Sequence, residues 1–284
     1  VTPMLEDGSV DWKGLEKLVE WHIEQGTNSI IAVGTTGEAS TLSMAEHTQV
    51  IKEIIRVANK RIPIIAGTGA NSTHEAIELT KEAKELGADA ALLVTPYYNK
   101  PTQEGLYQHY KAIASCVEIP FMLYNVPGRT GVDLQASTVI RLFDDISNIY
   151  GIKEATGSLE RAISLISQRK DLVLVSGDDA IDFPMLANGA KGIISVTANL
   201  LPNLKSQLVD CVFKGDFEKA KQINEDLYAL NSVLFCESNP IPIKAAMYLA
   251  GLLDTLEYRL PLTAPSAETM KKLEKTLEKY EVIK

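Results

Sequence analysis

Cysteine is scarce in this chain, and long apolar runs are absent from it. Cys116, Cys211 and Cys236 are too few and too scattered for a disulfide framework, and their spacing does not match that of zinc ligands. We therefore expect reduced, mostly buried thiols in a cytoplasmic protein. No apolar run approaches the roughly 18 residues that a transmembrane helix needs, and no signal peptide is indicated. Because the chain starts at Val1 without Met, a few leading residues are expected to be missing.

Positive charge is also in short supply. The chain has 28 Lys and Arg residues against 37 Asp and Glu residues, which gives a net charge of −9. This balance argues against a general nucleic-acid binder and against a protein of anionic membrane surfaces. It does not exclude an anionic small substrate, because a local cluster of donors can outweigh the field of the whole protein.

A strand–helix pattern recurs along the first two thirds of the chain. Short apolar runs, each followed by a longer amphipathic segment, start about every 20 to 33 residues, the length of one strand, one helix and two loops. Near-continuous apolar runs are typical of parallel strands that are covered on both faces. The runs are 29–34, 62–67, 90–95, 120–125, 149–153, 172–177 and 192–196.

Eight such units would close into a (β/α)8 TIM barrel, an α/β fold, and we expect the eighth strand to survive only as a tail at residues 1–3. The alternative is an open doubly wound sheet. Its dinucleotide loop needs a third glycine, which the turns at 34–37 and 67–69 lack.

The strand pattern stops near residue 200, which predicts the domain organisation. We expect the barrel to span residues 1–200 and a C-terminal helical extension, packed on the barrel, to span residues 201–284. Within the extension, helices are predicted at 204–234 and 266–279, with a loop at 239–242 between them.

Lys153 is the main candidate for covalent chemistry. It ends the run 149–153. The carboxyl ends of barrel strands meet at the mouth that carries the active site. Lys191 instead stands at the start of the run 192–196, so we expect it at the opposite end of the barrel. In a poorly hydrated pocket the lysine pKa falls, and the neutral amine can form a Schiff base. Strand alternation directs Lys153 and Tyr124 into the barrel lumen and places Gly151 on the face of Lys153, where it is expected to make room for the long side chain. A solvated surface lysine is the alternative.

Histidine is missing from the predicted mouth, so proton transfer has to use other groups. A tyrosine can serve when its phenol lies in a hydrogen-bonded chain. The hydroxyls at the strand ends belong to Thr35, Tyr98 and Tyr124. Aromatic packing for the tyrosines and a turn role for the threonine are the alternatives. The histidines, all in segments expected to be helical, are His22, His47, His74 and His109.

Two features suit carboxylate binding. Arg129 lies in a loop with Pro and Gly, where a guanidinium can hold a carboxylate with two hydrogen bonds, although a surface salt bridge is the alternative. The backbone amides of Thr35 and Thr36, at a tight turn, could hold a second carboxylate. Asp178 and Asp179 could bind a metal, but we expect a loop or cap role for them and predict no metal site.

Four sequence motifs, in a fixed order along the chain, indicate a protein family. They are GTTGE at 34–38, YY at 97–98, YNVPGRTG at 124–131 and GIKEATG at 151–157, with NPIPIK at 239–244 in addition. Together they resemble the dihydrodipicolinate synthase family, also called 4-hydroxy-tetrahydrodipicolinate synthase, within the pyruvate-dependent class I aldolases. The likeness runs from Thr2 to about Leu262.

This resemblance implies a lyase that condenses pyruvate with L-aspartate-4-semialdehyde in lysine and diaminopimelate biosynthesis. It implies that Lys153 forms the imine, that Tyr124 donates and accepts protons, and that Thr35 and Tyr98 complete a hydroxyl relay. Tyr98 would reach into a neighbouring subunit, since the family is usually a homotetramer built from tight dimers. No metal or organic cofactor is expected, because the lysine supplies the electron sink.

The resemblance also implies the binding residues. Thr36 and the backbone at Ile194 would hold pyruvate, and Arg129 would receive the carboxylate of the semialdehyde. N-acetylneuraminate lyase and keto-deoxy-sugar aldolases share the fold and the imine chemistry, but Arg129 and the Thr-Thr pair favour the synthase. A barrel that senses a keto acid without turnover is a further alternative, against which Lys153 and Tyr124 argue.

A lysine-inhibition site is the last feature that the resemblance suggests. Lysine-sensitive members carry a histidine where this chain has Met44 and a serine where it has Ala39, so we predict weak or absent inhibition. The residues that do match that site are His47, Asn71, Glu75 and Tyr97.

Overall fold

The computed structural model describes residues 1–280, which contain seven strands, and the chain forms two compact units. One unit comprises residues 1–62 and the chain from Ser195 onward, and the other comprises residues 63–194. The seven strands lie where the apolar runs predicted them. The division into a barrel and an extension at residue 200 stays a prediction.

The second unit is built on six strands that pair in sequence order, all in parallel. β3 and β4 are almost wholly buried, as expected for strands covered on both faces. The strands are β2 (Ile64–Gly67), β3 (Ala90–Val94), β4 (Phe121–Asn125), β5 (Ile149–Glu154), β6 (Val173–Ser176) and β7 (Gly192–Ile193).

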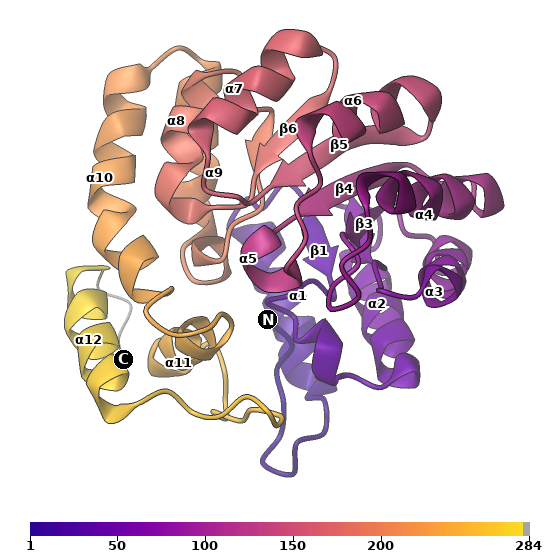
Figure 1. The fold of residues 1–284 in the computed structure, drawn as a ribbon. Coiled ribbons are helices and arrows are strands. Elements are labelled where there is room, and N and C mark those ends of the chain that lie inside the picture. Colours follow the sequence, from indigo (N-terminus) through magenta and orange to yellow (C-terminus); the bar gives the residue numbers. More distant parts are fainter. Residues whose placement is uncertain (281–284) are drawn as a thin grey trace. The chain divides into compact units, whose positions relative to one another are not determined.

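The helices of this unit alternate with its strands, and α3, α4, α6 and α7 lie along one face of the sheet (Figure 1). Consecutive members of this helix layer are neighbours. The short α5 instead follows directly on the end of β4. The helices are α3 (Thr73–Leu86), α4 (Gln103–Cys116), α5 (Pro127–Thr130), α6 (Ala136–Asp145), α7 (Leu159–Gln168) and α8 (Asp182–Ala187).

Local sequence explains where α3 begins and ends. The Ser72 hydroxyl accepts a hydrogen bond from the Glu75 N–H, and Gly87 ends the helix at a left-handed φ of 94°. Its Ala76, Leu79 and Ala83 are buried, in the i, i+3, i+7 spacing of one helix face.

The first unit contains β1 (Ile30–Ala32), α1 (Trp12–Glu24) and α2 (Met44–Ala58), and the two helices pack together. α2 begins with a capping box, in which Ser43 and Glu46 satisfy each other's backbone N–H groups. Residues 1–3, expected to be the tail of a strand, lie outside any strand. Met4 instead forms an isolated antiparallel bridge with Val10.

The C-terminal helices correct two predictions. The single helix expected at 204–234 is broken into two, because Gly215 takes a left-handed φ of 79° and Asp216 caps the second helix. The loop expected at 239–242 already contains the start of a helix, and proline is tolerated in a first helical turn. The helices are α9 (Pro202–Phe213), α10 (Phe217–Val233), α11 (Ile241–Leu249) and α12 (Ala267–Leu277).

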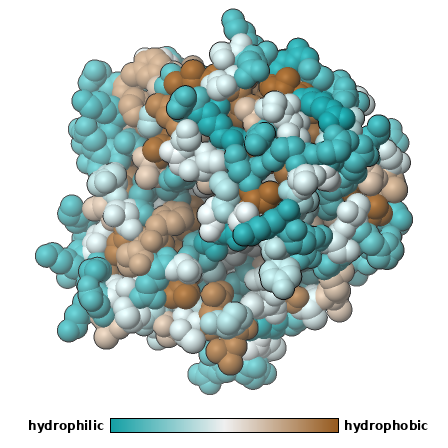
Figure 2. All heavy atoms as spheres, in the orientation of Figure 1, coloured by the Kyte–Doolittle hydropathy of each residue, from teal (hydrophilic) through white to brown (hydrophobic). Residues whose placement is uncertain are grey.

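The surface is mixed. The face shown in Figure 2 is mostly hydrophilic, with smaller apolar patches between.

Cys211 is buried, but Cys116 and Cys236 are exposed, so the expectation of mostly buried thiols is wrong. Both exposed cysteines lie at or beyond helix ends, where the helical period no longer decides burial. Among residues 1–280, no helix is long and apolar enough to cross a membrane.

Candidate active site

Lys153 and Tyr124 are neighbours on adjacent strands of the second unit. They are register partners of β5 and β4, and the Lys153 Nζ lies 4.3 Å from the centroid of the Tyr124 ring. Tyr124 is 7% exposed, and Lys153 is half-buried. The strand alternation that predicted a common face for the two side chains therefore leads to a direct contact. In its ammonium form, such a lysine is attracted to the ring face by the cation–π interaction.

Gly177, rather than Gly151, makes room for the lysine. A Cβ on Gly177 would lie 2.7 Å from the Lys153 Cε and 2.9 Å from the Ala155 Cβ. A Cβ on Gly151 would lie 2.1 Å from the carbonyl oxygen of Val173, so this glycine lets strand β6 approach β5. The predicted role of Gly151 is therefore wrong. The available sequence signal was the glycine that ends the run 172–177.

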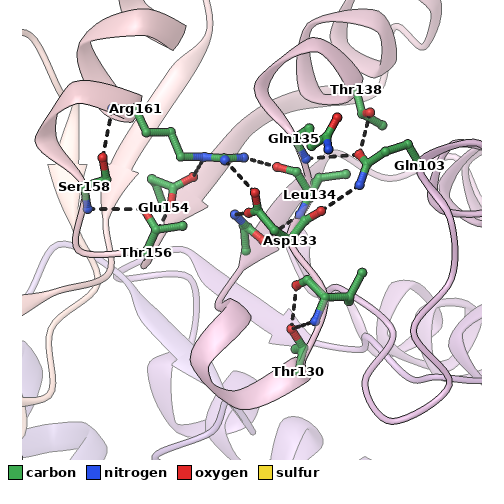
Figure 3. Close-up of polar contacts among 12 residues, drawn as sticks. Gln103, Thr130, Asp133, Leu134, Gln135, Thr138, Glu154, Thr156, Ser158 and Arg161 are labelled. Atoms are coloured by element: carbon green, nitrogen blue, oxygen red, sulfur yellow. Dashed lines mark hydrogen bonds and ion pairs between the residues drawn. The ribbon is translucent and has the colours of Figure 1, made fainter.

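Arg129 is exposed on α5, at the end of β4. The single turn of α5 ends at Gly131, whose φ is 71° and whose N–H donates to the Pro127 carbonyl at 3.0 Å. The Thr130 hydroxyl donates to the Val132 carbonyl at 2.9 Å (Figure 3). The loop backbone is thus closed by its own hydrogen bonds, so Arg129 lies on a turn of defined shape.

A buried ion pair follows directly on Lys153, and sequence reasoning missed it. The Glu154 side chain is 0% exposed, and its Oε2 accepts from the Arg161 Nε at 2.9 Å. Its Oε1 accepts from the Thr156 N–H at 2.9 Å. A charged residue inside an apolar strand run was the only sequence signal, because the partner comes from the next helix (Figure 3).

Tyr98 stands apart from the pair. Its φ is 73°, its side chain is 88% exposed, and its N–H donates to the Thr130 carbonyl at 3.3 Å. Within residues 1–280, no hydrogen bond joins its hydroxyl to that of Tyr124. The backbone bond nevertheless ties the Tyr97-Tyr98 turn to the loop that carries Arg129.

Thr35 and Thr36 lie in a tight turn of the first unit. Two backbone hydrogen bonds close this turn: the Gly37 N–H donates to the Gly34 carbonyl at 3.0 Å, and the Glu38 N–H donates to the Thr35 carbonyl at 3.1 Å. Asn239 donates to the Thr36 hydroxyl at 3.0 Å. The NPIPIK segment thereby fixes one of the predicted pyruvate ligands.

A second buried ion pair holds the end of this turn. The Lys244 Nζ lies 2.6 Å from the Glu38 Oε1, and the two side chains are 1% and 0% exposed. Lys244 also donates to the Glu257 carbonyl at 2.5 Å. Burial lowers the pKa of Lys244, and the Glu38 carboxylate opposes this shift. Glu38 itself has a left-handed φ of 57°, a conformation that a rigid partner helps to maintain.

Ile194 and Asp178 occupy the ends of the last two strands of the second unit. The Ile194 N–H donates to the Ser176 carbonyl at 2.8 Å, which fixes the backbone of this predicted pyruvate ligand. Asp178 accepts from the Ala180 N–H at 3.1 Å, so the predicted cap role is confirmed. No cluster of three or more His, Cys, Asp or Glu suited to a metal occurs among residues 1–280.

Three of the four residues that match the lysine-inhibition site, Asn71, Glu75 and Tyr97, lie close together. Asn71 donates to the Tyr97 carbonyl at 3.2 Å, and burial and then the charge of Glu75 raise the pKa of Tyr97. His47 is buried on α2 in the first unit, and like the other three histidines it lies in a helix, as predicted.

The family model of the dihydrodipicolinate synthetase family matches residues 1–280. The 4-hydroxy-tetrahydrodipicolinate synthase of Aliarcobacter butzleri is 65% identical over 285 residues, which cover 100% of this chain and 96% of that protein.

Two solved structures are similar along the whole chain. One is the chloride-inhibited dihydrodipicolinate synthase from Acinetobacter baumannii complexed with pyruvate, 63% identical with a TM-score of 0.97, covering 100% of this chain and 97% of that one. The other is dihydrodipicolinate synthase from Aquifex aeolicus, 45% identical with a TM-score of 0.97, covering 100% and 96%.

These similarities confirm the resemblance seen in the sequence motifs. They also confirm the (β/α)8 barrel with a C-terminal helical part and the function of a lyase that condenses pyruvate with aspartate semialdehyde in lysine biosynthesis. With a match that covers residues 1–280, the chain belongs to the dihydrodipicolinate synthetase family.

Proposed function

We propose that the condensation takes place on Lys153, with Tyr124 as the proton donor and acceptor beside it. The observation that carries this proposal is the 4.3 Å contact of the Lys153 Nζ with the Tyr124 ring, at the carboxyl ends of adjacent parallel strands. An amine fixed beside a phenol has both the nucleophile and the acid–base group that imine chemistry needs.

The proposed reaction proceeds through an enamine. The Lys153 amine adds to the keto carbon of pyruvate, and loss of water gives the imine. Loss of a proton from the pyruvate methyl group gives the enamine, whose carbon attacks the aldehyde carbon of the semialdehyde. The aldehyde oxygen is protonated to a hydroxyl. The amino group of the semialdehyde then adds to the imine carbon, which closes the ring and releases Lys153.

The remaining groups are proposed to bind the two substrates and to relay protons. Thr36 and the Ile194 carbonyl hold pyruvate, and the exposed guanidinium of Arg129 receives the carboxylate of the semialdehyde. Thr35 and Tyr98 complete the relay with Tyr124. The chemistry needs no metal or organic cofactor, because the imine nitrogen accepts the electrons.

A homotetramer in the cytoplasm fits these roles. A tyrosine that is 88% exposed on the single chain, with a backbone fixed by Thr130, is suited to serve a neighbouring subunit. The barrel is proposed to end near residue 200 and the helical extension to follow. Size measurement in solution tests the assembly, and a fully active monomer would contradict the role of Tyr98.

Borohydride trapping with pyruvate tests the proposed nucleophile. The unaltered chain should gain one reduced pyruvate adduct in its intact mass, and peptide mapping should place it on Lys153 rather than on the exposed Lys191. Arg129→Ala should keep the adduct but lose most of the condensation. An adduct on another lysine would overturn the assignment.

Lysine inhibition is proposed to be weak or absent. Asn71, Glu75 and Tyr97 lie together, but Met44 and Ala39 replace the histidine and serine of lysine-sensitive members. Tight lysine binding in a calorimetric titration would contradict this proposal.

A further inference from the structure

We propose that Arg161 is a positioning residue for the second substrate, because it fixes the base of the loop that carries Arg129. This inference rests on the proposed role of Arg129 in carboxylate binding. The Arg129 loop comprises residues 126–132, between the end of β4 and the start of α6. Arg161 lies outside the loop, in the first turn of α7.

The base of the Arg129 loop is closed by one buried side chain. The Nδ2 of Asn125 donates to the Asp133 Oδ1 at 2.8 Å, and its Oδ1 accepts from the Leu134 N–H at 3.0 Å. Asn125 is 0% exposed, so these bonds are shielded from water. The two ends of the loop are therefore held together at a fixed separation.

Arg161 connects this base to the strand of the proposed nucleophile. Its Nε binds the Glu154 Oε2 at 2.9 Å, its Nη1 binds the Asp133 Oδ2 at 3.0 Å, and its Nη2 donates to the Leu134 carbonyl (Figure 3). The planar guanidinium thus spans the space between Glu154 and the far end of the loop, which one ammonium group could not do with the same geometry.

Burial makes this connection stiff. The Arg161 side chain is 15% exposed and that of Glu154 is 0% exposed. Gln103 supports the same segment from α4, since its Nε2 donates to the Asp133 carbonyl at 2.7 Å and its Oε1 accepts from the Gln135 N–H at 3.1 Å. The base of the loop is held from β4, α4 and α7 together (Figure 3).

The expected effect is specific to the second substrate. Lys153 is held by pairing of β5 with both β4 and β6, so loss of the Arg161 contacts leaves the proposed nucleophile in place. The Arg129 loop depends on its base, and a shift of about 1 Å in a positioning group can cost roughly a hundredfold in rate. Arg161 therefore controls the binding of the semialdehyde and not the formation of the imine.

Arg161→Lys is the main test, because it keeps a positive charge beside the buried Glu154 while it removes the fork. We expect a rise of about tenfold in the KM for the semialdehyde, with the KM for pyruvate and the borohydride-trapped adduct unchanged. Asp133→Asn, at a side chain that is 44% exposed, keeps the Glu154–Arg161 pair and should give a smaller rise in the same KM.

Arg169→Lys is the matched control. Arg169 forms an ion pair with Asp144 at the other end of α7, with side chains 39% and 37% exposed, and its replacement should change neither KM.

Two outcomes overturn the inference. One is an Arg161→Lys protein that traps pyruvate and keeps both KM values. The other is a parallel loss of adduct, both KM values and thermal stability in Arg161→Lys and Asp133→Asn, which would mark a purely structural role. Absence of an adduct on Lys153 in the unaltered chain would instead refute the proposed function, so the two failures are distinguishable.

Discussion

Lys153 and Tyr124 face each other across β5 and β4, with the Nζ 4.3 Å from the centroid of the phenol ring. The contact uses the ring face, so the Tyr124 hydroxyl lies at the edge of the pair and stays available for proton transfer. Cation–π attraction at a partly desolvated site is worth about 0.5 to 2 kcal/mol. It restricts the amine to one position without using up a hydrogen-bond acceptor.

Replacement of Gly177 by Ala should impair imine formation more than stability. The new Cβ would lie 2.7 Å from the Lys153 Cε and 2.9 Å from the Ala155 Cβ, so the long lysine side chain gives way and the chain at Ala155 has to shift slightly. We expect a strong loss of trapped pyruvate with a thermal midpoint only moderately below that of the parent. The measurements are borohydride trapping and thermal unfolding.

Two other glycines serve as controls for Gly177. Gly192→Ala should be tolerated, because its Cβ would make an ordinary 3.6 Å contact with Val175. Gly151→Ala should unfold or destabilise the protein, since its Cβ would meet the Val173 carbonyl at 2.1 Å. Normal pyruvate trapping by Gly177→Ala would show that the lysine does not need this space.

Tyr124→Phe should slow turnover while the fold persists. The ring and its contact with Lys153 remain, but the hydroxyl is lost, and acid–base groups contribute about 10²- to 10⁴-fold to rates. We expect kcat to fall by that order, with the adduct still trapped after longer incubation. An unchanged kcat in a coupled steady-state assay would remove Tyr124 from the proposed relay.

Lys244→Met should destabilise the protein strongly. It leaves the Glu38 carboxylate buried without its ion-pair partner, and breaking such a pair costs about 3 to 5 kcal/mol in the free energy of unfolding. The double variant Glu38→Gln with Lys244→Met should recover part of the loss. Urea unfolding measures both.

An exposed ion pair of the same unit is the control for Lys244. Lys17 and Asp254 lie 3.4 Å apart with side chains 71% and 72% exposed, so Lys17→Met should leave the unfolding midpoint unchanged. Equal effects of the Lys17 and Lys244 variants would contradict the special cost of burial.

Acid should weaken the protein partly through His109. Burial lowers the pKa of His109 from 6.5 to about 4. Between these values the unfolded chain binds a proton that the folded chain does not, so this contribution to stability is complete above pH 6.5 and is lost as the pH falls toward 4. His109→Gln should flatten the pH dependence of urea unfolding in that window. Burial also lowers the pKa of His22 to about 4. Because His22 is present in both proteins, the difference between their pH dependences reports on His109 alone. Identical slopes for parent and variant would contradict the prediction.

Much of the fold follows from local patterns. The apolar runs predicted all seven strands. The alternation within 149–153 was enough to place Lys153 on the face of Tyr124. The capping box at Ser43 and the glycine at 87 set helix ends through contacts within one turn of the chain, so their signal is local in the sequence.

Long-range side-chain contacts could not be predicted in this way. Nothing near Glu154 indicates that Arg161 will bind its carboxylate and also reach Asp133, because that geometry depends on how a helix packs on the sheet. Gly177 was missed for a similar reason: its role appears only when the neighbouring strand brings Lys153 against it. A periodic pattern also continued across Gly215, which hid a break between two helices.

The Glu38–Lys244 pair joins positions that are 206 residues apart in the chain. A shortened protein that ended before Asn239 would keep the GTTGE turn but lose both the amide that donates to the Thr36 hydroxyl and the Lys244 ammonium that pairs with Glu38. The buried Glu38 carboxylate would then lack its ion-pair partner, next to the turn that carries Thr36. Residues 239–244 thus stabilise the GTTGE turn of the first unit, although they lie outside the strand–helix repeats.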